Sequence, residues 1–109
     1  MKKIFIAGLF ISLATIVNAD CNTGSCSGVT IDNLYAMSNG TIMIETTGNE
    51  KNLNCTSYGA GFTSIDPNAA GKNAIYSLLL TAQTTNKNVY IRIVENSVNC
   101  RIAYAFITK

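Results

Sequence analysis

The chain has 109 residues, of which 48% are hydrophobic and 13% charged, with four cysteines and no histidine. Without histidine the commonest general base is missing, so a serine or cysteine nucleophile has no usual activator. Removal of the first 19 residues would take away Lys2 and Lys3 and bring the net charge from +2 to zero. A near-neutral chain lacks the basic surface that phosphate groups require, so we expect no nucleic-acid partner and no anionic membrane partner.

The first nineteen residues predict a secretory signal peptide. Lys2 and Lys3 precede an apolar run over residues 4–17, and the small Ala19 follows shortly after it. The run is shorter than the about 20 apolar residues that span a bilayer. We therefore expect cleavage after Ala19, a single domain over residues 20–109, no membrane anchor after cleavage, and a secreted or periplasmic location in a bacterium.

Four cysteines in an oxidising compartment predict two disulfides. The spacing favours Cys21 with Cys26, around the flexible Gly24, and Cys55 with Cys100, which closes a loop of about 45 residues. In the chain-entropy model the short loop contributes about 2 kcal/mol and the long one about 4 kcal/mol. The two alternative pairings, which tie the N-terminal arm to the body, stay open at this point. The sequence has no CxxC pair and no histidine, so we expect no metal site.

Short strands are expected after a polar arm over residues 20–27. The first covers residues 29–37, with an irregularity at Asp32–Asn33. Asn39-Gly40 then predicts a hairpin turn into a second strand over residues 41–45. A third strand is expected over residues 53–58, bent by the glycines that follow it.

The period of the apolar residues then changes to that of a helix. The apolar stripe falls at positions i, i+3, i+4 and i+7, namely Ile75, Leu78, Leu79 and Ala82, and Asn86 suits a helix end. Strands follow over residues 89–94 and 100–106. The order of three strands, one helix and two strands predicts a mainly β protein with one helix. The expected architecture is a five-stranded OB-fold-like barrel with the helix between strands 3 and 4.

Catalysis has little support in the sequence. Asp32 and Glu45 could face each other across the first hairpin as a two-carboxylate hydrolase, but we favour the simpler interpretation that both are solvated residues of a strand face or turn. No phosphate-binding loop, calcium loop or metalloprotease motif occurs. We therefore expect a protein that is not an enzyme and has no cofactor.

The candidate binding residues are tyrosines and their polar neighbours. A tyrosine ring offers a flat apolar surface and a polar tip, which suits binding of a sugar or a protein. Tyr35 and Asn33 lie near the first hairpin, and Tyr58 lies beside two glycines. These three residues are the predicted ligand-binding residues, and the charge-poor surface favours a neutral polar ligand.

The segment IYSLLLTAQTTNKNVYIRI over residues 75–93 resembles the helix-to-strand passage of the B subunits of subtilase cytotoxin and their pertussis-like toxin relatives. Cys55 before the helix and Cys100 after the following strand fit the same scheme. The resemblance implies an OB-fold binding subunit that recognises cell-surface glycans and forms a homo-pentamer, with or without a catalytic toxin chain. This chain is shorter than those subunits and has no tryptophan.

A second interpretation comes from the small size and the expected disulfides. An exported, cross-linked β domain also suits a periplasmic inhibitor or immunity-type protein that binds a partner enzyme. In that case the loop over residues 58–62 would be the anchor.

Overall fold

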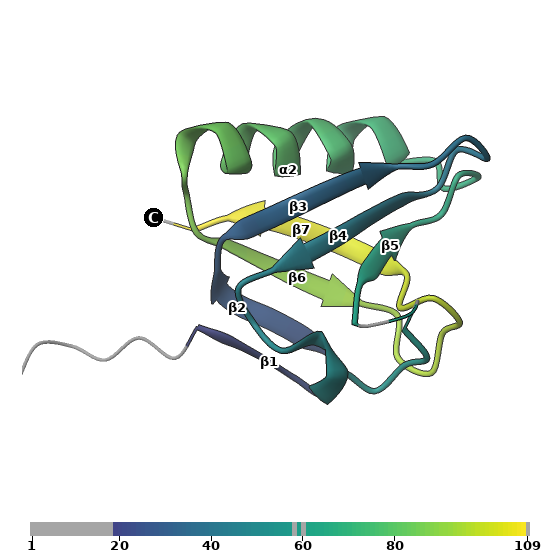
Figure 1. Ribbon diagram of the computed structural model, residues 1–109, viewed down its shortest axis with the longest axis horizontal. Coiled ribbons are helices and arrows are strands. Elements are labelled where there is room, and N and C mark those ends of the chain that lie inside the picture. Colours follow the sequence, from purple (N-terminus) through teal and green to yellow (C-terminus); the bar gives the residue numbers. More distant parts are fainter. Residues whose placement is uncertain (1–18, 58, 60, 109) are drawn as a thin grey trace, which may run out of the picture.

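Figure 1 shows the computed structural model, which describes residues 19–57, 59 and 61–108. The expected signal peptide and Tyr58 lie outside the described residues. One antiparallel sheet has the order β1-β2-β6-β7 and the other has the order β3-β4-β5. The strands are β1 (Asp20–Asn22), β2 (Ser25–Val29), β3 (Ile31–Ala36), β4 (Ile42–Thr46), β5 (Thr63–Ile65), β6 (Val89–Ile93) and β7 (Ile102–Ile107). The described helices are the short 3-10 helix η2 (Glu50–Asn52) and α2 (Lys72–Thr85).

The chain is mainly β with one α-helix, as expected, but the described strands do not close into a barrel. Seven strands form two sheets, so the five-stranded OB-fold barrel is not confirmed. Two contacts nevertheless connect the sheets. At one corner only Thr30 separates β2 from β3, and its backbone exchanges hydrogen bonds with Thr47. At another, Ser64 of β5 forms a parallel bridge with Arg101, directly before β7.

The strand boundaries differ from the expectation in two places. The polar arm is not irregular, because β1 and β2 form a hairpin in which Cys21 and Cys26 lie opposite each other. The third strand does not run over residues 53–58, where the structure has only isolated bridges at Leu53 and Thr56. Strand β5 follows later, as three buried residues that pair antiparallel with β4 in the same sheet. The expected irregularity at Asp32–Asn33 is a register shift between β3 and β4.

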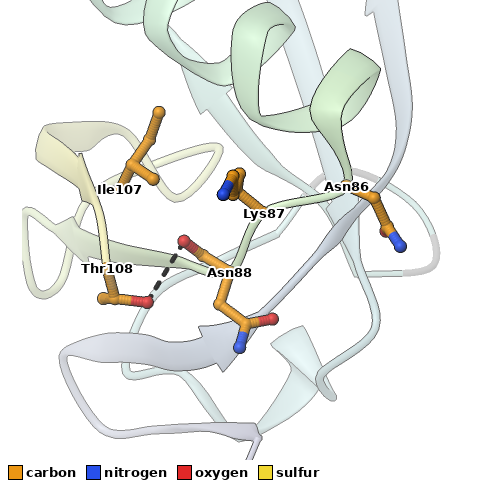
Figure 2. Close-up of a pocket in the computed structure, with 5 residues that line it drawn as sticks. All are labelled: Asn86, Lys87, Asn88, Ile107 and Thr108. Carbon is orange, nitrogen blue, oxygen red and sulfur yellow. Dashed lines mark hydrogen bonds between the residues drawn. The ribbon is translucent and has the colours of Figure 1, made fainter.

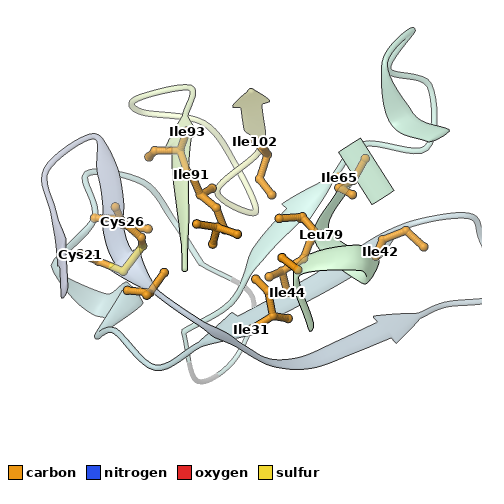
Figure 3. Packing of buried hydrophobic residues seen from close by; sticks show 14 residues of the cluster. Cys21, Cys26, Ile31, Ile42, Ile44, Ile65, Leu79, Ile91, Ile93 and Ile102 are labelled. Carbon is orange, nitrogen blue, oxygen red and sulfur yellow. A yellow bond between two sulfur atoms is a disulfide. The ribbon is translucent and has the colours of Figure 1, made fainter. Parts of the chain in front are cut away.

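Helix α2 covers the core, as the apolar stripe predicted. It lies along β3 and β7 (Figure 1), and its Leu79 and Ala82 are fully buried. Asn86 ends the helix in the left-handed conformation with φ 54°, and its N–H donates to the carbonyls of Ala82 and Gln83. Figure 3 shows how Leu79 packs among isoleucines that come from both sheets.

Both disulfides that the spacing favoured are present. Cys21 is bonded to Cys26 and Cys55 to Cys100, and no described cysteine is free. Cys21 and Cys26 belong to the buried core, where they cover one end of the β2–β6 sheet. Two disulfides suggest an oxidising environment, extracellular or periplasmic. Within residues 19–108 as described, no helix has the length and apolar character needed to cross a membrane.

Candidate functional site

The predicted residues Asn33 and Tyr35 lie on the same surface, which we call the β4 face: the side of β3 and β4 that carries Asn33, Tyr35 and Glu45 and faces away from the buried Ile44. Alternation along β3 places both side chains on this side, opposite Glu45 and Met43 of β4. The Asn33 amide donates a hydrogen bond to Glu45 Oε1 over 2.6 Å. The Tyr35 ring packs edge-on against Phe62, with 5.2 Å between ring centroids and 74° between planes.

The β4 face therefore combines a ring surface with an amide–carboxylate pair. Tyr35 is 45% exposed, and the Asn33–Glu45 bond is exposed as well. Such a surface can stack the apolar side of a small polar molecule and bond its hydroxyl groups. Tyr58, the third predicted residue, is not described. Phe62, which the prediction had placed only in a possible anchor loop, completes the aromatic pair.

The two-carboxylate hydrolase gains nothing from this geometry. The register places Asn33, not Asp32, opposite Glu45, because of the shift that follows Ile31. The Glu45 carboxylate is already bonded to an amide. Asp32 instead contacts the helix through its backbone carbonyl, which accepts a hydrogen bond from the Gln83 amide.

A second aromatic surface lies on the outward side of β6 and β7. The Tyr90 ring stacks on Phe106, with 4.8 Å between ring centroids and 13° between ring planes. It also stacks on Tyr104, with 6.2 Å between centroids and 18° between planes. We call these three rings the aromatic row. Tyr104 is 50% and Phe106 46% exposed, whereas Tyr90 is shielded between them. The sequence carries a local signal for this surface, because positions 90 and 92 of one strand and positions 104 and 106 of the other fall on one face of each strand.

Polar groups border the aromatic row at the Tyr104 end. Arg92 lies opposite Tyr104 and forms an ion pair with Glu95 at 3.1 Å, and Glu95 also accepts a hydrogen bond from Asn54. A side-chain hydrogen bond with Ser25 and the nearby Arg92 lower the pKa of Tyr90. The polar groups at this end are thus bonded to one another and carry no net charge.

Gly24 lets the Arg92 guanidinium lie against the backbone. A side chain at Gly24 would place its Cβ only 2.6 Å from Arg92 Nη1 and 3.0 Å from Glu95 Oε2. The glycine that the sequence suggested for the cysteine loop therefore also makes room for the Arg92–Glu95 pair.

A hollow of roughly 390 Å³ lies where the end of α2 leads into β6 and where β7 ends (Figure 2). The residues that line it are Asn86, Lys87, Asn88, Ile107 and Thr108. The Asn88 carbonyl accepts hydrogen bonds from the backbone N–H and the hydroxyl of Thr108, which ties the ends of β6 and β7 together. No sequence motif indicated this hollow.

The loop between β6 and β7, residues 94–101, exposes an apolar side chain to solvent. Val98 is 66% exposed at its tip. Both neighbours of Val98 form backbone hydrogen bonds with Thr56. The Thr56 N–H donates to the Ser97 carbonyl over 3.0 Å, and the Asn99 N–H donates to the Thr56 carbonyl over 2.6 Å. Asn99 and two further residues of the loop, Asn96 and Cys100, have positive φ angles between 47° and 68°, a costly conformation for residues other than glycine.

The described residues hold one group of side chains with the composition of a metal site. Ligand atoms of Cys21, Cys26 and Glu50 lie within 4.8 Å of one another. The two sulfurs are bonded to each other, so neither offers a thiolate. The Glu50 carboxylate is instead bound by the Thr46 N–H and hydroxyl at 2.7 and 2.6 Å, and burial raises its pKa above the ordinary value.

Comparisons with known proteins identify no relative. No family model matches the chain, and no curated protein or solved structure is significantly similar to it.

Proposed function

We propose that this is an exported, non-catalytic binding protein that recognises a glycan on the β4 face. The observation that carries the proposal is the pair of the exposed Tyr35 ring and the half-buried Phe62 ring beside the Asn33–Glu45 hydrogen bond. A sugar offers apolar C–H groups on one side of its ring and hydroxyls at its edge, and this face has a matching surface for each. The near-neutral composition after loss of the signal peptide agrees with an uncharged polar ligand.

We infer further that the two sheets are the halves of a partly open barrel of the OB type. Support comes from the order in which strands meet: β3, β4 and β5, then through Ser64 and Arg101 to β7, β6 and β2. Because β2 and β3 are separated by Thr30 alone, they act as one bent strand that serves both halves. OB-folds bind oligosaccharides on the face of their second and third strands, which here are β4 and β5.

A ring of five subunits is the assembly that the toxin resemblance implies. Strands β3 and β7 each end a sheet, and β7 carries six consecutive uncharged residues. An uncharged edge strand readily pairs with another strand, so pairing between neighbouring copies would cover it. Light scattering of the purified protein tests this assembly, and a monomer at micromolar concentration would contradict it.

A glycan array followed by titration calorimetry tests the binding proposal. The protein should be purified from an exporting host with both disulfides formed. We expect binding that Tyr35→Ala weakens about tenfold and Tyr35→Phe changes little, because ring stacking supplies most of the contact. Leu80→Ala, on helix α2, is the matched control, since Leu80 is also exposed and lies outside the β4 face. Unchanged glycan binding in Tyr35→Ala would refute the location on the β4 face.

One observation favours the alternative of an inhibitor or immunity-type protein. The loop over residues 94–101 holds Val98 rigidly in solvent, and a rigid, pre-organised loop loses little entropy on binding a partner protein. Pull-down from cell envelope and culture fluid separates the two functions. An inhibitor should capture one hydrolase in a one-to-one ratio, and the Val98→Asp variant should no longer capture that hydrolase. A glycan-binding protein should bind saccharide equally well in the Val98→Asp variant.

A further inference from the structure

We propose that Glu45 sets the specificity of the β4 face, so that this face selects neutral saccharides and rejects saccharides that carry a carboxylate. The inference rests on the proposed function for the location of the site. It adds the class of saccharide and the residue that selects it. The observation behind it is that a carboxylate lies at the centre of the face, between an amide donor and an aromatic ring.

The strand register gives Glu45 its central position. Glu45 belongs to β4, the middle strand of its sheet, and lies opposite Asn33 of β3. The register of β4 with β5, continued by one residue, places Phe62 on its other side, and the ring contact with Tyr35 agrees with that position. Tyr35 is the diagonal neighbour of Glu45, and diagonal neighbours lie about 7–8 Å apart, within reach of a large ring. A sugar stacked on either ring would therefore bring its edge close to Glu45.

The Glu45 carboxylate can accept further hydrogen bonds. An ionised carboxylate only accepts, and its two oxygens offer about four acceptor positions. The Asn33 amide donates to Oε1 over 2.6 Å, and no second described group donates to this carboxylate. Hydrogen bonds to a charged acceptor are about twice as strong as those between neutral groups. A sugar hydroxyl at the edge of the ring would therefore gain a charge-assisted hydrogen bond, in an orientation that the amide fixes.

The charge of Glu45 has no neutralising partner in the part of the chain that the structure describes. None of the described lysines and arginines forms an ion pair with it, including Lys51, whose side chain lies close to Gly61 beside the aromatic pair. Burial is the main cause of the raised pKa of Glu50, and the charge of Glu45 adds to it, so this charge acts on its surroundings. A ligand carboxylate at the same edge would meet a negative charge and be repelled.

Matched saccharides that differ by one charge test the inference. Methyl glucoside and methyl glucuronide form the smallest pair, and neutral and sialylated forms of one core glycan form a larger pair. In calorimetry at low ionic strength, we expect the unchanged protein to bind the neutral member at least about tenfold more tightly. The preference should shrink at about 0.5 M salt, because salt screens charges at an exposed site. This salt dependence needs no variant, so it tests the inference independently of any effect of a substitution on folding.

Glu45→Gln is the decisive variant, because it removes the charge and keeps an acceptor oxygen for the Asn33 amide. It should bring the affinities for the two members of a pair within about threefold of each other, through weaker binding of the neutral member and tighter binding of the acidic one. Glu95→Gln is the matched control. It removes the same charge from a carboxylate of similar size in the loop after β6 and should leave the preference unchanged.

The outcomes separate this inference from the proposed function. Equal or tighter binding of the acidic member by the unchanged protein would overturn the inference and leave glycan binding on the β4 face intact. A preference that persists in Glu45→Gln, or that salt does not weaken, would do the same. Saccharide binding that gives no NMR shifts at Asn33, Tyr35 and Glu45 would refute the location on the β4 face and this inference with it. Absence of saccharide binding in both pairs and on the glycan array would overturn both.

Discussion

Replacement of Leu79 by alanine tests whether helix α2 holds the two sheets together. Leu79 has no exposed surface and packs among isoleucines of both sheets (Figure 3). Loss of three carbon atoms at about 0.8 kcal/mol each removes roughly 2 kcal/mol of transfer free energy. The cavity left behind adds about 1–2 kcal/mol, so we expect the free energy of unfolding to fall by about 3–4 kcal/mol. For a domain of this size the Tm should fall by about 12 °C or more.

Urea unfolding followed by far-ultraviolet circular dichroism measures this change in the disulfide-bonded protein. Leu80→Ala is the matched control, because Leu80 is the next residue of the same helix but is 37% exposed, and should cost less than about 1 kcal/mol. The slope of the unfolding free energy against urea should stay the same in both variants. Equal losses in the two variants would refute the placement of the helix over the core.

Three further predictions concern buried or crowded positions. Burial raises the pKa of Glu50, so the folded protein keeps this proton to a higher pH than the unfolded chain. Its contribution to stability is therefore lost as the pH rises through the interval between the two pKa values, and Glu50→Gln should flatten the dependence of Tm on pH over that interval. Gly48→Ala should cost about 1–3 kcal/mol in urea unfolding, because the added Cβ would lie 2.9 Å from Cys21 Sγ; a cost near zero would mean that this corner is loosely packed. Removal of the Cys55–Cys100 disulfide by double replacement with alanine should lower the stability by about 4 kcal/mol, as chemical denaturation would show, and a loss under 1 kcal/mol would contradict the chain-entropy reasoning.

The elements that the sequence predicted well are those with a clear local signal. The apolar stripe through Leu79 and Ala82 predicted the helix. Asn86 predicted its end, because an asparagine tolerates the left-handed conformation that ends a helix. The strands over 89–93 and 102–107 followed from alternation of apolar and polar residues. The spacing favoured the cysteine pairing that the structure has, although it left two other pairings open.

What the sequence could not predict depends on contacts between distant segments. Strand β5 has only three residues; it pairs with β4, and its Ser64 donates hydrogen bonds to the carbonyls of Asn99 and Cys100, far along the chain. The β1–β2 hairpin could not be recognised within the polar arm, because the buried residues of its paired segment are Cys21 and Cys26. The sequence there lacks the alternating aliphatic residues that indicate strands.

The candidate site was found only in part for the same reason. Asn33 and Tyr35 are two residues apart on one strand, so their common face is a local property. The contact with Phe62 and the stacking of Tyr90 on Phe106 join strands that lie apart in the chain. The hollow beside Asn88 depends on where the last strand ends against the start of β6, and no pattern of residue types encodes that position.

The single residue between β2 and β3 has a consequence for the motions of the molecule. Thr30 transmits any displacement of one sheet directly to the other, because its backbone groups are bonded to Thr47 and leave no slack at the corner. We therefore expect the two sheets to open together, and amide hydrogen exchange should report a common opening free energy across β2, β3 and β4.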